Sequence, residues 1–409
     1  MKTMRYEQRL IWVLGITFGF LFFDRNAANY VMPFIVDDLH FNNQQVGLLA
    51  SALSFTWALS SYLGGVLSDR TGLRKPVLLV SVVAFSVCSA LSGLAMSFAA
   101  LFAARLLMGL VEGPFLPVCQ SLVAAESDHA RRGNNMGVMQ NFGSNFLGSF
   151  LAPLLLVPIA AHWSWRMAFF LSAVPGLVMA ILIARYVHEP GRRSHPLAGE
   201  RAVPGQLEML RYRNMLLCTL MSIVMVAWMV LGWAFLPLFY VKVRHIDANG
   251  GMKVLMSLLG LSAAFFSFIV PRLSDRLGRR PVVVMFNLLG LLVPLAALYW
   301  QGSIWMLGVL IFIGWAASGT FPLFMGTIPS ETIPPRYVAT ALGITVGIGE
   351  IFGGVCGPAI AGWAADRSTL AAPLVIQAGC AIAGALIALG LQETAPSRVA
   401  RAAAASVAT

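Results

Sequence analysis

Long uncharged stretches fill most of this 409-residue chain. A helix that crosses the hydrocarbon core of a bilayer needs ~20 apolar residues, whereas a barrel strand needs only ~9–11 residues of alternating polarity. The composition agrees, because 58% of the residues are hydrophobic and 11% are charged, against about 25% charged in soluble proteins. The sequence therefore predicts an all-α membrane protein and excludes a soluble protein or an outer-membrane barrel. The stretches are 41–68, 76–104, 133–161, 214–241, 281–330 and 368–392.

Charged residues and Gly- or Pro-rich breaks divide the chain into twelve predicted membrane-spanning helices. The longest stretch is divided at the polar turn 299–303. Because the number of helices is even, both termini lie on the same side of the membrane. The expected helices are 11–34, 47–67, 76–98, 99–125, 136–160, 166–187, 215–240, 251–271, 281–300, 304–330, 338–364 and 371–392.

The distribution of the 28 lysines and arginines sets the orientation of these helices. Short cytoplasmic loops hold an excess of such residues, and most of them fall on the side of the termini. The opposite loops hold only Arg166, Lys242, Arg244, Lys253 and Arg367. We therefore expect a multi-pass protein of the cell inner (plasma) membrane with both termini in the cytoplasm. The net charge of +11 then reflects topology, and the partner that we expect is the lipid bilayer and no nucleic acid.

Proline and charged residues recur in the two halves of the chain at an offset of about 205 residues. Pro117 recurs as Pro322 and Glu126 as Glu331, and further matches follow at positions 131 and 153. Several matches in one register indicate duplication of a six-helix unit. We predict an N-terminal six-helix half at 1–187, a cytoplasmic linker at 188–214, a C-terminal six-helix half at 215–392 and a cytoplasmic tail at 393–409.

A short charged loop follows the second predicted helix and recurs after the eighth. Two parallel six-helix halves with a long cytoplasmic linker are typical of alternating-access transporters, and the loop resembles the signature of the major facilitator superfamily. The resemblance implies two pseudo-symmetric halves and a cytoplasmic gate, in which Asp69 neutralises helix N-termini or a neighbouring arginine. The alternative is that the basic residues only enforce topology. The gate residues are Gly65, Asp69, Arg70, Gly72, Arg74 and Lys75, with Asp275, Arg276, Gly278 and Arg279 in the second half.

Five ionisable residues lie inside predicted spans, namely Asp24, Arg25, Arg105, Glu112 and Glu350. A charge at the bilayer centre costs ~2.5–3.5 kcal/mol on insertion scales, so each one indicates a functional site. The first two lie near the middle of the first helix. The two charges of the fourth helix are seven residues apart, which places them on one face about 10 Å apart along the axis. We therefore expect four charges to meet in one cavity of the N-terminal half.

The chemistry of these four groups favours proton-coupled anion binding. Arginine keeps its charge, whereas a carboxyl group in a low-dielectric site can be neutralised by a proton. While Asp24 and Glu112 are ionised, each arginine has an internal partner. Once both acids are protonated, Arg25 and Arg105 can bind a substrate carboxylate bidentately. The alternative is a permanent ion-pair network that only orients the two helices.

Glu350 is the exception in the C-terminal half, because the counterparts of Asp24, Arg105 and Glu112 there are apolar. Three roles stay open for Glu350: a second proton carrier, a ligand for a cationic or hydroxylated substrate group, or a protonated structural hydrogen-bond donor. Further polar side chains could line the site, although such residues in membrane helices often join helices instead. These further candidates are Asn29, Tyr30, Asn141 and Asn145.

The same residues resemble one branch of the superfamily. Asp24 and Arg25 with Asn29, the segment from Arg105 to Pro117, and the segment 329–334 are similar to the anion:cation symporter family of bacterial sugar-acid transporters and their vesicular relatives. The resemblance implies uptake of an organic anion together with protons. Glu350 departs from this pattern, because sugar-acid members tend to have a neutral polar residue, often Asn, in that part of the eleventh helix.

The function that we expect is therefore proton-coupled import of an organic anion, such as a sugar acid or an aromatic acid, by a monomer. A proton-coupled drug or metabolite exporter of the same superfamily is the main alternative, and a transporter-like solute sensor is a third. The chain carries no phosphate-binding glycine loop, metal cluster or nucleophilic triad, so we expect neither an enzyme nor a bound metal or cofactor.

Overall fold

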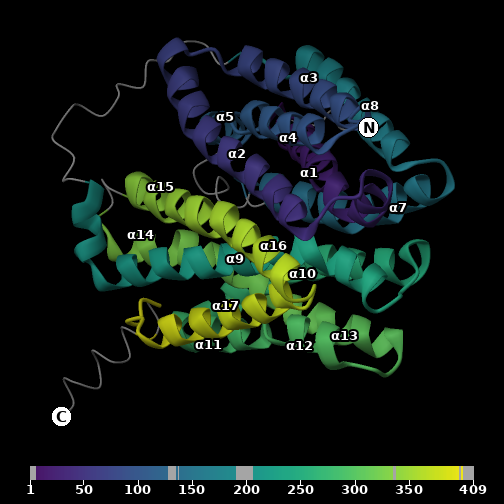
Figure 1. Ribbon diagram of the computed structural model, residues 1–409. Coiled ribbons are helices and arrows are strands. Elements are labelled where there is room, and N and C mark those ends of the chain that lie inside the picture. Colours follow the sequence, from purple (N-terminus) through teal and green to yellow (C-terminus); the bar gives the residue numbers. More distant parts are fainter. Residues whose placement is uncertain are drawn as a thin grey trace, which may run out of the picture. The chain divides into compact units, whose positions relative to one another are not determined.

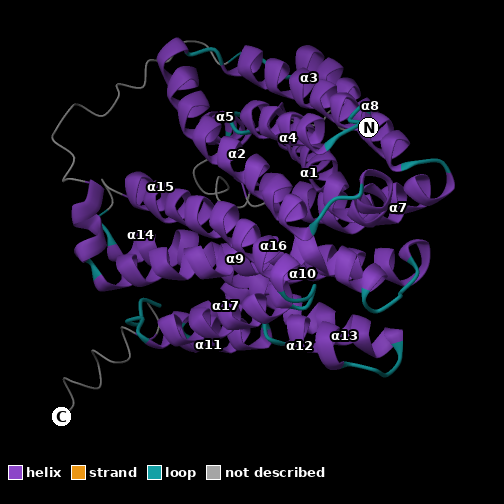
Figure 2. Ribbon diagram, viewed as in Figure 1, coloured by secondary structure: helices purple, strands orange, loops and turns teal. Residues whose placement is uncertain are grey.

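A computed structural model describes residues 6–127, 135–136, 138–189, 206–334, 338–395 and 398. Every regular element in these residues is a helix (Figures 1 and 2). The first elements are α1 (Tyr6–Leu39), α2 (Asn43–Thr71), α3 (Arg74–Gly93), α4 (Phe98–Glu112), α5 (Phe115–Glu126), η1 (Val138–Leu151), α7 (Ala152–His162) and α8 (Trp165–Tyr186). Elements labelled η are π or 3₁₀ helices.

The later elements begin with η2 (Gln206–Arg211), α9 (Arg213–Lys242), η3 (Ala248–Met252), α10 (Lys253–Leu277), α11 (Arg279–Leu289), α12 (Leu292–Tyr299) and α13 (Ile304–Gly314). They continue with η4 (Trp315–Thr320), η5 (Leu323–Thr327), α14 (Ile328–Thr332), α15 (Val338–Ile348), η7 (Gly349–Cys356), α16 (Gly357–Arg367) and α17 (Ala372–Leu389).

Eleven helical stretches of the described residues are long and apolar enough to cross a membrane, and α2 adds a further helix of 29 residues. The all-α prediction is therefore confirmed, and the number of spans agrees with the predicted twelve. Several spans consist of consecutive elements, because proline and glycine interrupt the helical hydrogen bonds. The fourth span, for example, is α4 followed by α5, with Gly113 and Pro114 between them.

The chain divides into two compact units. The first comprises residues 1–195 and 237–261, and the second comprises 196–236 and 262–409. Residues 237–242 at the end of α9 and residues 253–261 at the start of α10 belong to the first unit. In the first unit α1 packs against η1 and α8, and α3 packs against α8 and α4. In the second unit α11 packs against α17 and η4.

Close backbone contact brings η1 against α1 and α4 against α2. A Cβ atom on Gly143 would lie 2.0 Å from the carbonyl oxygen of Gly15, and one on Gly109 would lie 2.4 Å from that of Leu53. Small residues allow membrane helices to approach in this way. The polar side chains on these helices are therefore held within a rigid frame.

The internal repeat extends to unusual backbone conformations. His40 and His245 both have a φ of 53°, and they are 205 residues apart. Such left-handed values are uncommon for residues other than glycine and often end helices. Gly72 and Gly278 likewise have positive φ values of 68° and 105°. Gly72 lies two residues before the start of α3, and Gly278 directly precedes α11. The duplication is thus visible in turns as well as in sequence.

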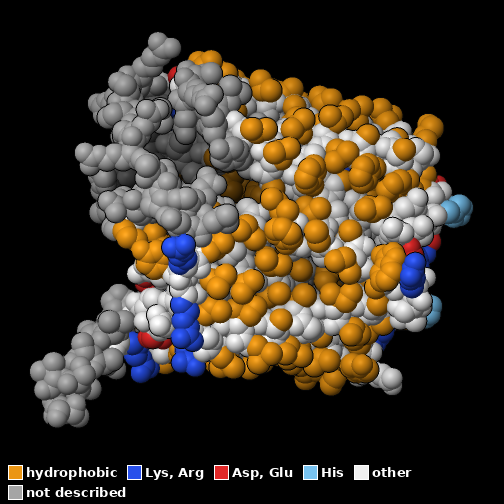
Figure 3. All heavy atoms as spheres, turned by 60° about the vertical axis from the view of Figure 1, so that its left-hand side comes forward, with side chains coloured by type: hydrophobic (Ala, Val, Ile, Leu, Met, Phe, Trp, Pro, Cys, Tyr) orange, Lys and Arg blue, Asp and Glu red, His pale blue; other side chains and the backbone are white. Residues whose placement is uncertain are grey.

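The outer surface fits a lipid environment. Hydrophobic side chains are spread over the part of the face in Figure 3 that is not grey, and Lys and Arg side chains lie toward its left and right sides. Val80, Ile181 and Leu386 are more than 60% exposed. An apolar surface of this extent is typical of a protein that contacts a membrane.

Candidate functional site

Asp24 lies near the middle of α1 and is fully buried. One of its carboxylate oxygens accepts hydrogen bonds from the hydroxyl groups of Ser89 in α3 and Ser172 in α8, the latter at 2.8 Å. The other oxygen has no hydrogen-bond partner among the described residues. The acid therefore joins three helices of the first unit through one oxygen and leaves the second one open.

Arg105 of α4 is also buried. Its Nη2 atom donates to the backbone carbonyl of Arg25 at 2.6 Å, and its Nη1 atom lies 3.1 Å from the sulfur of Met108. A guanidinium group has five N–H donors, so these contacts leave donors for a further acceptor. The contact with the backbone of Arg25 fixes α4 beside the middle of α1.

Glu112 is the last residue of α4 and is fully buried. Neither of its carboxylate oxygens has a hydrogen-bond partner in the described part of the chain. The helix is interrupted directly after it, and hydroxyl groups of α2 support the interruption. Ser60 donates to the carbonyl of Gly109 at 3.0 Å, and Ser61 donates to that of Gly113 at 2.9 Å. A buried acid whose oxygens accept no hydrogen bond from the described residues thus lies at a break in a membrane helix.

Arg25 is half-buried and lies against aromatic rings. Its guanidinium carbon is 4.9 Å from the ring centroid of Trp57 and 5.5 Å from that of Phe22. Such cation–π contacts contribute about 0.5–2 kcal/mol and leave the in-plane N–H groups available. The aromatic partner Trp57 was not among the residues predicted from the sequence.

The structure brings the four predicted charges of the first unit together. Coulombic interactions connect Glu112 with Arg25, Asp24 and Arg105. However, none of the ion pairs of the described residues joins one of these arginines to one of these acids. The direct pairs that we expected are absent here because serine hydroxyls, a backbone carbonyl and aromatic rings occupy Asp24, Arg105 and Arg25 instead.

The further polar candidates differ in their surroundings. Tyr30 is fully buried, and its hydroxyl group lies 3.4 Å from the carbonyl oxygens of Gly148 and Ser149 in η1. Asn29 and Asn145 are half-buried, while the side chain of Asn141 lies outside the described residues. The neighbouring Asn26 was not predicted, although it also contacts the carbonyl of Gly148, at 3.4 Å.

Glu350 belongs to the second unit, in the π-helical element η7, and is half-buried. Its element packs closely on α9, because a Cβ atom on Gly353 would lie 2.3 Å from the carbonyl oxygen of Ile223. The buried part of α9 also carries an aromatic cluster. The ring centroids of Trp228 and Trp315 are 4.6 Å apart, and Trp233 packs edge-on against Trp315.

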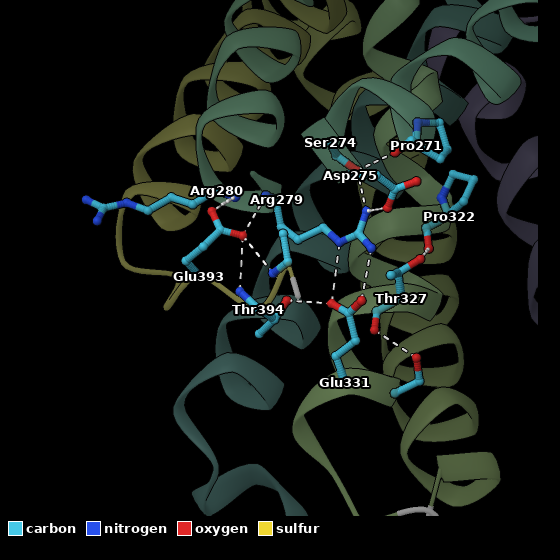
Figure 4. Close-up of polar contacts among 12 residues, drawn as sticks. Pro271, Ser274, Asp275, Arg279, Arg280, Pro322, Thr327, Glu331, Glu393 and Thr394 are labelled. Atoms are coloured by element: carbon cyan, nitrogen blue, oxygen red, sulfur yellow. Dashed lines mark hydrogen bonds and ion pairs between the residues drawn. The ribbon is translucent and has the colours of Figure 1, made fainter. Parts of the chain in front are cut away.

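Two of the four predicted gate residues of the second unit, Asp275 and Arg279, form ion pairs in the described residues (Figure 4). Arg279 pairs with Asp275 at 2.5 Å and with Glu331 at 2.9 Å. Glu393, which follows α17, accepts hydrogen bonds from the backbone N–H groups of Arg279 and Arg280, at 2.8 and 3.3 Å. The carboxylate thus caps the N-terminus of α11, where the helix dipole favours negative charge. A Cβ atom on Gly278 would lie 2.5 Å from a carboxylate oxygen of Glu393, and Arg276 is exposed in α10.

The first unit contains the equivalent cap. Glu189, which follows α8, accepts hydrogen bonds from the backbone N–H groups of Arg74 and Lys75, both at 2.8 Å. The Nζ atom of Lys75 also donates to the carbonyl of Ala184. Gly65 lies in α2 and Gly72 in the turn after it, but the side chains of Asp69 and Arg70 are outside the described residues. Glu189 and Glu393 were not predicted, although their similar place after the sixth and twelfth spans was a readable signal.

The described residues contain no group of three or more His, Cys, Asp or Glu side chains that could hold a metal ion. The candidate site consists of the carboxylates of Asp24 and Glu112 and the guanidinium groups of Arg25 and Arg105.

Comparison with known proteins places the chain among membrane transporters. A probable 4-methylmuconolactone transporter of Cupriavidus pinatubonensis is 25% identical over 353 residues, which cover 85% of this chain and 81% of that protein. A hexuronate transporter of Bacillus subtilis is 35% identical over 168 residues, 41% of this chain and 39% of that protein. The multidrug resistance protein MdtG of Citrobacter koseri is 26% identical over 325 residues, 75% of this chain and 78% of that protein.

The fold is shared with solved transporters. A crystal structure of a bacterial homolog of the human lysosomal transporter Spinster, inward-facing and occupied, matches with a TM-score of 0.78 at 18% identity. The match covers 95% of this chain and 98% of that one. The family model of the Major Facilitator Superfamily matches residues 14–349 and 252–408. With its all-helical fold, this chain belongs to the Major Facilitator Superfamily, as a multi-span membrane transporter of a small molecule and not an enzyme.

Proposed function

We propose that this transporter is a proton-coupled symporter that imports an organic anion carrying a carboxylate. The observation that supports the proposal most directly is Glu112, which is fully buried without a hydrogen-bond partner in the described residues and interacts electrostatically with two arginines. We further propose a monomer in the inner membrane with both termini in the cytoplasm. Its two six-helix halves are 1–187 and 215–392, joined by the linker 188–214.

The acids supply the proton coupling in this proposal. A buried carboxylate is costly unless it is paired or protonated. Among the described residues, Glu112 has no hydrogen-bond partner, and Asp24 has one oxygen without a hydrogen-bond partner. Both groups can therefore gain a proton without breaking an existing ion pair. Glu350 is a candidate for a second proton-carrying or substrate-binding acid.

The arginines supply the recognition of the anion. Arg105 is anchored to the backbone of α1 but has donors to spare, and Arg25 is held by aromatic rings. When Asp24 and Glu112 are neutral, the net charge of the four groups rises from zero to plus two, which favours a carboxylate in the site. Asn29, Tyr30, Asn141 and Asn145 are proposed to add polar contacts. The names of the 4-methylmuconolactone and hexuronate transporters agree with an organic acid as substrate.

The gate residues close the cytoplasmic side in this proposal. Arg279 connects Asp275 at the end of α10 with Glu331 of α14, so the network holds three helices of the second unit together. The loop of the first half, from Gly65 to Lys75, is proposed to act in the same way. Breaking these contacts is then part of the conformational change.

Export of a drug or metabolite is the second candidate, and similarity to MdtG favours it. An exporter also needs buried acids, but it moves its substrate against the direction proposed here. Two buried arginines are better suited to an anion than to a lipophilic cation.

The test is substrate-induced alkalinisation outside lightly buffered vesicles that contain the purified protein. The panel comprises sugar acids, aromatic carboxylates and dicarboxylates. Entry of proton and anion together predicts alkalinisation with one class of compound and none in vesicles that contain Glu112→Gln. Asp366→Asn, an exposed acid at the end of α16, is the matched control and is expected to behave as wild type. No alkalinisation with any acid, together with proton-driven expulsion of cationic dyes, would reject import and favour the exporter.

A further inference from the structure

Ser89 and Ser172 are buried serines that share two acceptors. Both hydroxyl groups contact the same oxygen of Asp24. Each also lies 3.0 Å from the backbone carbonyl oxygen of Phe169. The two hydroxyl oxygens are 2.9 Å from one another. Two donors thus face an acid on one side and a neutral carbonyl on the other.

Each hydroxyl group carries one proton and can donate it to only one acceptor at a time. An ionised carboxylate is a much stronger acceptor than a carbonyl, so both serines turn to Asp24 while it is charged. A protonated carboxyl group loses most of this advantage. The carbonyl of Phe169 then offers each hydroxyl an acceptor at a suitable distance, without movement of the backbone.

We propose that Ser89 and Ser172 form a hydroxyl switch that ties α1 to α3 and α8 while Asp24 is ionised and releases α1 when Asp24 is protonated. The inference rests on the proposed function, in which Asp24 takes up a proton. The proton comes from water and binds the carboxylate oxygen that has no partner, and it returns to water when the carboxyl group ionises. The serines are positioning residues, because they act on Asp24 and not on the substrate.

The second half of the chain supports a functional role for this pair. At an offset of 205, Ser89 corresponds to Pro294, Ser172 to Gln377 and Asp24 to Met229. Proline has no donor, and Gln377 donates to the backbone carbonyl of Trp228 at 2.9 Å. A side chain of the last span therefore donates a hydrogen bond to the first span in each half. At these matched positions, the two hydroxyl groups occur in the half that carries the acid.

Other groups around Asp24 are the same in all serine variants. Arg105 and Glu112 of α4 and Cys88 of α3 interact with it electrostatically. None of them donates a hydrogen bond to Asp24 in the described residues. Changes at the serines consequently report on the hydroxyl groups themselves.

The experiment measures the pH dependence of anion uptake for Ser89→Ala, Ser172→Ala and the double variant in proteoliposomes. Each lost hydroxyl removes a donor that favours the ionised form of Asp24. The pH above which uptake falls should therefore rise by about one unit for each hydroxyl removed. Ser172→Thr retains a hydroxyl group and should restore the wild-type profile. Ser172→Cys keeps a similar shape with a weak donor and should resemble the alanine variant.

Ser92→Ala is the matched control, because Ser92 is a buried serine of α3 that, in the described part of the chain, donates to no acceptor but the carbonyl of Cys88, one turn away. It should leave the pH profile unchanged. A second readout is the infrared carbonyl band of protonated Asp24, assigned with Asp24→Asn, which should move in the alanine variants and stay in Ser92→Ala.

Wild-type pH profiles in both single alanine variants and in the double variant would overturn the switch, as would an equal shift in Ser92→Ala. Failure of the proposed function is distinguishable, because the wild-type protein itself would then show no proton uptake with any anion.

Discussion

Ser61 of α2 donates a hydrogen bond, at 2.9 Å, to the carbonyl oxygen of Gly113 in the break between α4 and α5. Four residues further along the chain, Pro117 lacks the N–H group that would bond this carbonyl in a regular helix. A hydroxyl group from a neighbouring helix thus replaces the missing backbone donor. The break that follows Glu112 is stabilised from outside its own helix.

Replacing Ser61 with alanine should therefore destabilise the protein. The carbonyl of Gly113 would lose its donor in a partly buried position, at a cost of about 1 kcal/mol. The measurement is the midpoint of thermal unfolding in detergent. Ser61→Thr retains the hydroxyl group and should unfold like wild type. Equal midpoints for alanine and wild type would show that the contact contributes nothing.

Glu112→Gln should remain folded in the membrane but lose proton-driven accumulation. The amide has nearly the shape of the acid and cannot take up and release a proton. Exchange of labelled for unlabelled anion needs no net proton movement, so it should persist in this variant. Accumulation that still follows the pH gradient would remove Glu112 from the coupling mechanism.

Arg105→Lys should weaken anion binding about tenfold, because hydrogen bonds to charged groups contribute ~1.5 kcal/mol or more and lysine lacks the planar fork of arginine. Lysine also cannot reproduce both the 2.6 Å contact with the Arg25 carbonyl and a bidentate contact with substrate. Ligand-induced thermal stabilisation measures the affinity. An unchanged affinity would place Arg105 outside the binding site.

Gly278→Ala should destabilise the second unit by about 1–2 kcal/mol, since a φ of 105° disfavours any residue with a Cβ atom. The added carbon would also lie 2.5 Å from a carboxylate oxygen of Glu393. Gly343→Ala in α15 is the control, because open space surrounds that position, and it should unfold like wild type or later. Similar midpoints for the two variants would contradict this account.

The charged core of the site could be predicted because Asp24, Arg105 and Glu112 interrupt apolar stretches, where every ionisable group is conspicuous. The side chains that form hydrogen bonds with these residues could not be predicted from the sequence. Ser89 and Ser172 resemble many other serines of membrane helices, and only the packing of α3 and α8 against α1 brings them to one carboxylate oxygen. Sequence spacing along one helix placed two charges on a face, but it could not decide which atoms they would contact.

The helices could likewise be predicted from the sequence, but the interruptions within them could not. Their existence follows from apolar length, so the spans agree with expectation. Their interruptions depend on local substitutes for lost hydrogen bonds, such as the hydroxyl of Ser61 at Gly113, and these come from other helices. The fourth helix was accordingly predicted as one continuous helix, 99–125, without the break at Gly113 and Pro114.

The two capping carboxylates have a consequence for how the polypeptide can be divided. Glu189 fastens the end of the sixth span to the third, and Glu393 fastens the twelfth to the ninth. Each six-helix half therefore contains both the capping carboxylate and the helix N-terminus that it caps. A cut placed between residues 190 and 205 would leave both capping contacts intact, because each carboxylate lies on the same side of the cut as the helix N-terminus that it caps.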